Sequence, residues 1–88
     1  APYGIRVNAV GPGAIETDMV AEVFSDEAAR KQALSQTPLG RFGSPAEVAS
    51  VIAWLASKEA SYLTGTTVWA DGGRLALSGR VAPPEPNE

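Results

Sequence analysis

The chain begins with a stretch in which apolar and polar positions alternate. Between residues 5 and 9 every second residue is apolar, so these side chains fall on one face of an extended backbone. Two of them are β-branched, a type that fits a pleated and buried surface. The pattern predicts a strand over residues 5–10 that ends in a turn at residues 11–13, which read Gly-Pro-Gly. Because open α/β sheets bind ligands just beyond the carboxyl ends of strands, this turn is either a ligand contact or a plain structural turn.

After this turn the spacing of apolar residues becomes helical. Thr17 followed by Asp18 is typical of a helix N-terminus, with a hydroxyl cap and an acid in the first turn. A second cap-like stretch at residues 25–27 predicts another short helix over residues 28–36. One proline and two glycines in residues 37–43 predict a loop.

The clearest local signal is a capping box. Ser44 stands at the N-cap, Pro45 at the first helical position and Glu47 at the third, and together they predict a helix that extends to about Ser57. Apolar residues then recur at the spacing of one helix face. The predicted core stripe consists of Val48, Val51, Ile52 and Leu55.

A second strand is predicted over residues 66–70, ended by Asp-Gly-Gly at residues 71–73. A strand, a crossover helix and another strand form a right-handed parallel βαβ unit, so the predicted fold class is α/β. Crossover loops usually contain about 2–6 residues, which makes the long insertion at residues 14–43 a candidate lid or binding loop. Residues 74–88 have no periodic pattern and predict a flexible tail whose last six residues are disordered.

Composition excludes several classes of function. A chain of 88 residues forms one small domain at most, and its net charge of -3 provides no basic surface for nucleic acid or an anionic membrane. The absence of cysteine and histidine excludes disulfides, thiolate or imidazole metal sites and histidine-based catalytic triads. No apolar run is long enough to span a bilayer, and no signal peptide is evident, so a cytoplasmic protein is expected.

The predicted elements do not make a complete sheet. Parallel sheets are covered on both faces and need several strands, whereas this sequence predicts two strands and one long helix. We therefore expect either a missing N-terminal part of the same protein or another copy of this chain to complete it.

Five motifs, in order and at the expected spacing, resemble the C-terminal third of the short-chain dehydrogenases/reductases. The resemblance covers residues 1–73 and implies a Rossmann-type doubly wound parallel sheet with a helical lid insertion. In such a fold residues 5–10 are the sixth strand, 44–57 the last long helix and 66–70 the seventh strand. The motifs are Ile5 to Gly13, Thr17, Gly40 to Ala49, Tyr62 to Gly65, and Asp71 to Gly73.

The same resemblance implies NAD(P)-dependent chemistry on alcohols or ketones, with NAD or NADP as cofactor and a small-molecule substrate. Pro12 and Gly13 would border the nicotinamide, while the backbone of Ile15 and the side chain of Thr17 would bond its carboxamide. Residues 18–40 would form the substrate lid. Members of the family commonly form dimers and tetramers, which implies a homo-oligomer through residues 44–57 and 66–73.

Parts of the family pattern are absent. The sequence contains neither the glycine-rich phosphate turn, nor the catalytic Ser, nor a Tyr-x-x-x-Lys pair. Tyr3 is followed four positions later by Val7, and Tyr62 by Thr66. The sequence therefore offers no catalytic residue, and this chain alone is predicted to be inactive.

Two alternatives remain open. In the first, residues 11–13 begin a Gly-x-Gly-x-x-Gly turn that binds a pyrophosphate. Glu16 then occupies the third glycine position of that motif, and its carboxylate faces the phosphates. In the second, the chain is a non-catalytic, self-assembling fragment or a structural half that docks on a separate chain.

Overall fold

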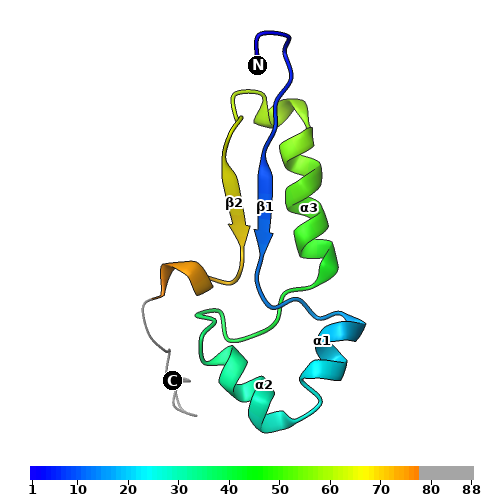
Figure 1. The fold of residues 1–88 in the computed structure, drawn as a ribbon, viewed down its shortest axis with the longest axis vertical. Helices are drawn as coiled ribbons and strands as arrows, with labels where there is room; N and C mark the ends of the chain where they lie inside the picture. Colours follow the sequence, from blue (N-terminus) through cyan, green and yellow to red (C-terminus); the bar gives the residue numbers. More distant parts are fainter. Residues whose placement is uncertain (78–88) are drawn as a thin grey trace.

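The computed structural model describes residues 1–77. In Figure 1 a pair of parallel strands lies beside α3, and the two shorter helices α1 and α2 lie beyond the carboxyl ends of the strands. The elements, in chain order, are β1 (Ala9–Pro12), α1 (Asp18–Val23), α2 (Glu27–Leu34), α3 (Pro45–Ala56), the 3₁₀ turn η1 (Lys58–Ala60), β2 (Thr67–Ala70) and the 3₁₀ turn η2 (Arg74–Ala76).

The two strands pair in parallel, in a register from Ala9 opposite Thr67 to Pro12 opposite Ala70. This pairing confirms the predicted α/β class with a parallel sheet. The predicted strand over residues 66–70 and the predicted helix over residues 44–57 are each within one residue of the observed β2 and α3.

The bounds of β1 correct the predicted strand over residues 5–10, because residues 5–8 precede the observed strand and two residues of the predicted turn belong to it. Gly11 and Pro12 are not in a turn after the strand but belong to it, and Gly13 continues the ladder by donating to the Ala70 carbonyl at 3.1 Å. The N–H groups of Ala9 and Gly13 both donate to carbonyls beside or within β2. Backbone N–H groups alternate in direction along a strand, so the nitrogen of Pro12 points away from β2. The N–H that proline lacks therefore costs no bond to β2. This pairing also excludes residues 11–13 as a pyrophosphate turn.

The helix α3 covers one face of the sheet. The register places Val10 and Val68 on that face, where both are half-buried. Ile5, Val7 and Trp69 remain 62%, 70% and 54% exposed. Within the described residues, one face of the parallel sheet is therefore uncovered.

Two polar residues at the beginning of the chain bind the segment that runs from the end of α3 to the start of β2. The Arg6 guanidinium donates to the carbonyls of Leu55, Ser57 and Leu63 at 2.9, 3.2 and 3.0 Å. Asn8 donates to the Leu63 carbonyl at 3.0 Å and accepts from the Thr66 N–H at 3.2 Å. A cation at the last turn of a helix satisfies carbonyls that have no partner within the helix.

The buried core is smaller than the helix pattern predicts. Among the described residues, the buried apolar residues are Phe42, Leu55 and Ala60. Leu55 is the buried member of the predicted α3 stripe, whereas Ile52 is 53% exposed. The pattern correctly identified a helix, but a two-stranded sheet is too narrow to bury the whole of its apolar face.

The predicted tail is partly ordered. Residues 74–76 form η2, which follows β2 through the Asp71 turn, although the sequence shows no periodic pattern there. The disorder predicted for the last six residues falls outside the described part of the chain. Among residues 1–77, no helix has the length and apolar character needed to cross a membrane.

Candidate functional site

The candidate site is the segment that leads from the carboxyl end of β1 into α1. It contains all four residues singled out from the sequence: Pro12, Gly13, Ile15 and Thr17. Figure 1 shows this segment passing beside the loop that connects α2 to α3. The candidates therefore lie at the edge of the sheet where ligands bind in open α/β folds.

A short parallel bridge fixes Ile15 against Gly43. The Gly43 N–H donates to the Ala14 carbonyl at 3.0 Å, and the Glu16 N–H donates to the Gly43 carbonyl at 2.8 Å. Because neighbouring peptide groups alternate in an extended chain, the N–H and C=O of Ile15 point away from residue 43. Neither group makes a hydrogen bond to any other described residue. Ile15 thus presents a free donor and a free acceptor on one side of the backbone.

Gly13 is required by close packing rather than by an unusual backbone angle. Its φ is not positive. A Cβ atom at this position would lie 2.8 Å from the Cα and 2.9 Å from the Cβ of Asp71. Glycine therefore allows the ends of β1 and β2 to approach, and this contact sets the direction in which the chain leaves the sheet.

Thr17 caps α1, as its sequence context predicts. Its hydroxyl oxygen accepts a hydrogen bond from the Val20 N–H at 3.2 Å. The Thr17 backbone is extended, with φ of -126° and ψ of 169°. The residue is exposed. An accepted bond at the oxygen leaves the hydroxyl proton available to a further acceptor. Capping and ligand binding are thus compatible at Thr17.

A cavity of about 580 Å³ lies next to this segment, between the α2–α3 loop, the beginning of α3 and the end of β2. Ile15 lines it, whereas Pro12, Gly13 and Thr17 do not. Residues from distant elements, including Leu39, Val48 and Trp69, also line it. The structure therefore brings one of the four candidates to the cavity, and the other three lie outside its lining.

The Asp-Gly-Gly turn after β2 is built by its own carboxylate. Asp71 accepts from the Leu75 and Gly73 N–H groups, both at 2.9 Å, and these bonds lower the pKa of Asp71. Gly72 has a positive φ of 63°, and its carbonyl accepts from the Leu39 N–H at 3.1 Å. This turn thereby holds the α2–α3 loop at the edge of the cavity.

The capping box at the start of α3 is reinforced by an ion pair. Glu47 accepts from the Ser44 N–H at 2.9 Å and binds the two guanidinium nitrogens of Arg41 at 2.9 and 2.8 Å. The Arg41 bonds, followed by the Ser44 backbone bond, lower the pKa of Glu47 from 4.5 to about 2. Glu47 is therefore a charged structural residue near neutral pH and is unsuited to proton transfer there.

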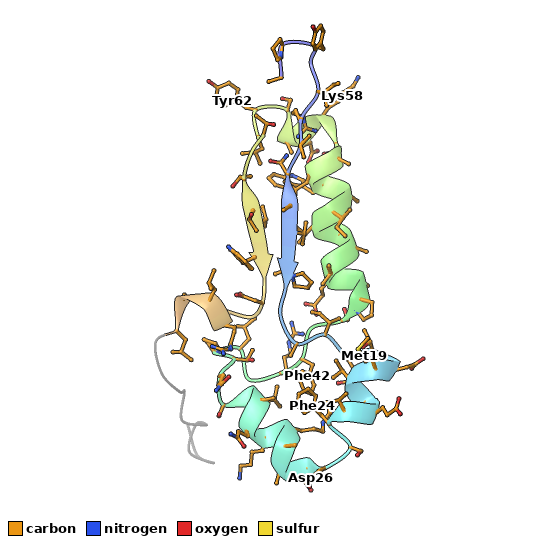
Figure 2. The ribbon with its side chains drawn as sticks, viewed as in Figure 1. Met19, Phe24, Asp26, Phe42, Lys58 and Tyr62 are labelled. Atoms are coloured by element: carbon orange, nitrogen blue, oxygen red, sulfur yellow. The ribbon has the colours of Figure 1, made fainter. Side chains whose placement is uncertain are left out.

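Sequence reasoning missed a cluster that connects the insertion to the candidate segment. Figure 2 shows Phe24 and Phe42 between α1 and α2, with ring centroids 5.9 Å apart. The guanidinium carbon of Arg30 lies 4.5 Å from the centroid of the Phe42 ring. Its Nη2 atom forms an ion pair with Oε2 of Glu16 at 2.9 Å. The partners are 14 residues apart, beyond helical spacing, so no local signal marks their pairing.

Among residues 1–77, two kinds of group bear on the chemistry of the candidate segment, namely tyrosine hydroxyls and metal-binding side chains. Tyr3 and Tyr62 are 90% and 100% exposed, and Figure 2 places Tyr62 at the opposite end of the sheet from Phe42. Within residues 1–77, no group of three or more carboxylates or other metal-binding side chains is close enough to hold a metal ion. The free peptide groups of Ile15 are suited to binding a polar amide.

Comparison with known proteins adds independent findings. The family model described as enoyl-(acyl carrier protein) reductase matches residues 1–74. The 3-oxoacyl-[acyl-carrier-protein] reductase FabG of Thermotoga maritima is 59% identical over 73 residues, which are 83% of this chain and 29% of that protein. The 3beta-hydroxysteroid dehydrogenase 1 of Eggerthella lenta is 49% identical over 79 residues, which are 90% of this chain and 30% of that protein.

A solved structure is similar at the level of the fold. A protein described as a 2-deoxy-d-gluconate 3-dehydrogenase from Agrobacterium tumefaciens, with bound NADP, superimposes with a TM-score of 0.83 at 38% identity. The match covers 86% of this chain and 31% of that structure. The chain thus spans about a third or less of the length of the relatives that it matches.

Proposed function

Because this chain belongs to the short-chain dehydrogenase/reductase family, we propose that residues 1–73 are the C-terminal part of the Rossmann-type domain of an NAD(P)-dependent oxidoreductase that acts on an alcohol or a ketone. In this proposal the chain supplies the loop beside the nicotinamide, the substrate lid and an oligomer interface. The match to a relative with bound NADP supports the cofactor class. We retain the cytoplasmic location as a prediction from the sequence.

The free peptide groups of Ile15 are the observation that carries this proposal. A primary carboxamide contains one carbonyl acceptor and an NH₂ donor, which complement the N–H and C=O that Ile15 presents on one side. The available hydroxyl proton of Thr17, two residues further along, adds a donor for the same group. Pro12 and Gly13, at the end of β1, would then border the ring.

In this proposal the chain binds and orients the nicotinamide but does not transfer a proton. The bound nicotinamide would accept or deliver the hydride. The residues of this chain would hold the carboxamide, and with it one face of the ring, toward the substrate. The proton donor required for carbonyl reduction would come from outside these 88 residues.

The insertion has the apolar surface expected of a substrate lid. Met19 and Val23 stand one helical turn apart on α1 and are 73% and 65% exposed. Leu39, on the loop beside the cavity, is 67% exposed. We propose that residues 18–40 close over the substrate and bury these side chains against it or against the rest of the enzyme.

Replacing Thr17 tests the carboxamide contact. In the complete enzyme, Thr17→Ala is expected to raise the KM for the cofactor by up to about tenfold, since one hydrogen bond contributes roughly 0.5–1.5 kcal/mol. Thr17→Ser keeps the hydroxyl and serves as the matched control. Steady-state kinetics at saturating substrate measure the effect, and thermal unfolding measures the separate loss of the helix cap. An Ala variant whose cofactor KM and stability both equal those of the parent would exclude both roles of Thr17.

The exposed apolar surface supports self-association. On α3, the small residues Ala49, Ala53 and Ala56 are exposed, and Trp54 is 43% exposed. Trp69 on β2 is 54% exposed. A sheet edge and a contiguous apolar surface favour pairing with another chain. We propose a homodimer or tetramer through residues 44–57 and 66–73, with closed symmetry.

Charge placed in this surface is expected to separate the copies. Trp69→Asp and Ala53→Glu should each shift the chain toward the monomer, because a carboxylate is poorly tolerated in an apolar contact. Sedimentation equilibrium at tens of micromolar compares both variants with the parent. A folded, monomeric parent would contradict the proposal, as would two variants whose mass distributions match that of an associated parent.

A further inference from the structure

The insertion formed by α1 and α2 is joined to the candidate site by a cluster of four side chains. Glu16, Arg30, Phe24 and Phe42, here called the insertion clasp, come from the site segment, from α2, from the residue after α1 and from the loop before α3. Phe42 is 8% exposed, one of the few buried apolar residues in the described chain. Its ring contacts Phe24 and Arg30, both from the insertion.

The ion pair in the clasp has a more constrained geometry than most surface pairs. The Arg30 nitrogens bind both carboxylate oxygens of Glu16, at 2.9 and 3.4 Å, and the side chains are 33% and 45% exposed. The guanidinium carbon lies 4.5 Å from the centroid of the Phe42 ring. A two-bond pair whose cation also stacks on a buried ring holds its geometry better than an isolated solvated pair.

The position of Glu16 gives the clasp its importance. Glu16 stands between Ile15 and Thr17, the two residues proposed to bond the carboxamide. Its backbone N–H is bound to the Gly43 carbonyl, while its side chain is bound to α2. A displacement of α2 would therefore pull directly on the peptide between the proposed contacts.

We propose that Glu16 and Arg30 are positioning residues that couple the placement of the α1–α2 insertion to the conformation of residues 15–17. The clasp keeps the free peptide groups of Ile15 and the Thr17 hydroxyl in register when the insertion covers the substrate. The inference rests on the proposed function, because it assigns the coupling to cofactor and substrate binding. In this proposal Glu16 and Arg30 contact neither the cofactor nor the substrate. They act by holding Ile15 and Thr17 in place.

Hydrogen exchange on the complete protein tests the coupling without any need for activity. In Arg30→Met and in Glu16→Gln, the α1 amides of Ala21 and Phe24 are expected to exchange about threefold to tenfold faster, because the insertion loses its tether. The amides of Ala9, in β1, and of Gly65, before β2, should keep the parent rates.

The control is Glu47→Gln, the same substitution in another two-bond ion pair. Glu47 pairs with Arg41 at the start of α3, and its amide replacement still fits a capping box. We expect this variant to leave the α1 amides unchanged. Equal acceleration in Glu16→Gln and Glu47→Gln, or acceleration in neither, would overturn the inference.

Kinetics distinguish positioning from general support of the fold. In Arg30→Met, the KM values for cofactor and substrate are expected to rise about threefold to tenfold while kcat stays within about twofold, and Arg30→Lys should fall between this variant and the parent. A fall in kcat with unchanged KM values would overturn the positioning role. If the parent has no NAD(P)H-dependent turnover but the exchange effect is present, the proposed function fails while the structural coupling stands.

Discussion

Residues 1–88 purified by themselves are expected to turn over no alcohol or ketone with either nicotinamide cofactor. Carbonyl reduction requires a proton donor within hydrogen-bond reach of the carbonyl oxygen. The chain contains no histidine or cysteine, and neither of its tyrosines is followed by lysine at the fourth position. Tyr62 is fully exposed at the far end of the sheet from the insertion, so it offers no donor at the site.

The measurement is NAD(P)H oxidation by the purified chain across a panel of ketones, with heat-inactivated protein as the control. The expected loss is complete, because binding groups alone do not supply the missing proton. Steady oxidation above the control would show that the chain carries its own donor. It would also require a different assignment of the catalytic residues.

Replacing Gly13 with alanine is expected to give the largest single-residue effect on stability and on cofactor binding. The new Cβ would lie 2.8 Å from the Asp71 Cα and 3.1 Å from its carbonyl oxygen, and both are backbone atoms. Relief requires the ends of β1 and β2 to separate. Overpacking of this kind costs about 1–3 kcal/mol of unfolding free energy. The same separation would shift Ile15 and Thr17 and weaken binding of the cofactor.

Gly43→Ala provides the matched comparison. Its Cβ would approach the Ile15 Cδ1 atom at 2.9 Å, but that atom is the end of a flexible side chain. Denaturant unfolding of the complete protein should therefore show a clearly smaller loss for Gly43→Ala than for Gly13→Ala. Equal losses would mean that the contact between the strand ends does not explain Gly13.

Much of the local structure could be predicted because its determinants lie within a few residues. The cap at Thr17 and the capping box at Ser44 are both present, and the cap-like stretch at residues 25–27 precedes a second short helix. The observed cap of α2 is Asp26, one residue later, and α2 ends at Leu34. These signals are hydrogen bonds between neighbours in sequence, so a single chain displays them directly.

The candidate site illustrates the opposite case. Its four residues follow from a family resemblance and remain proposed ligand contacts. The structure adds reasons for two residue types: close packing at Gly13 and an N–H that is not needed for pairing at Pro12. Gly11 and Pro12 lie in a strand because β2 pairs with them. Nothing within residues 5–13 indicates that pairing, and a Gly-Pro-Gly sequence considered alone favours a turn.

The sequence by itself determined the three helices, the caps at Thr17 and Ser44 and the second strand, since each depends on residue type and short spacing. Only the tertiary structure decided which backbone groups are free and which side chains meet. Arg6 reaches the end of α3 across 49 residues, and Glu16 reaches Arg30 across 14. The Ile15 peptide groups are free because Gly43 bonds to the residues on either side. Such pairings depend on where distant segments lie in space, and residue patterns do not encode that locally.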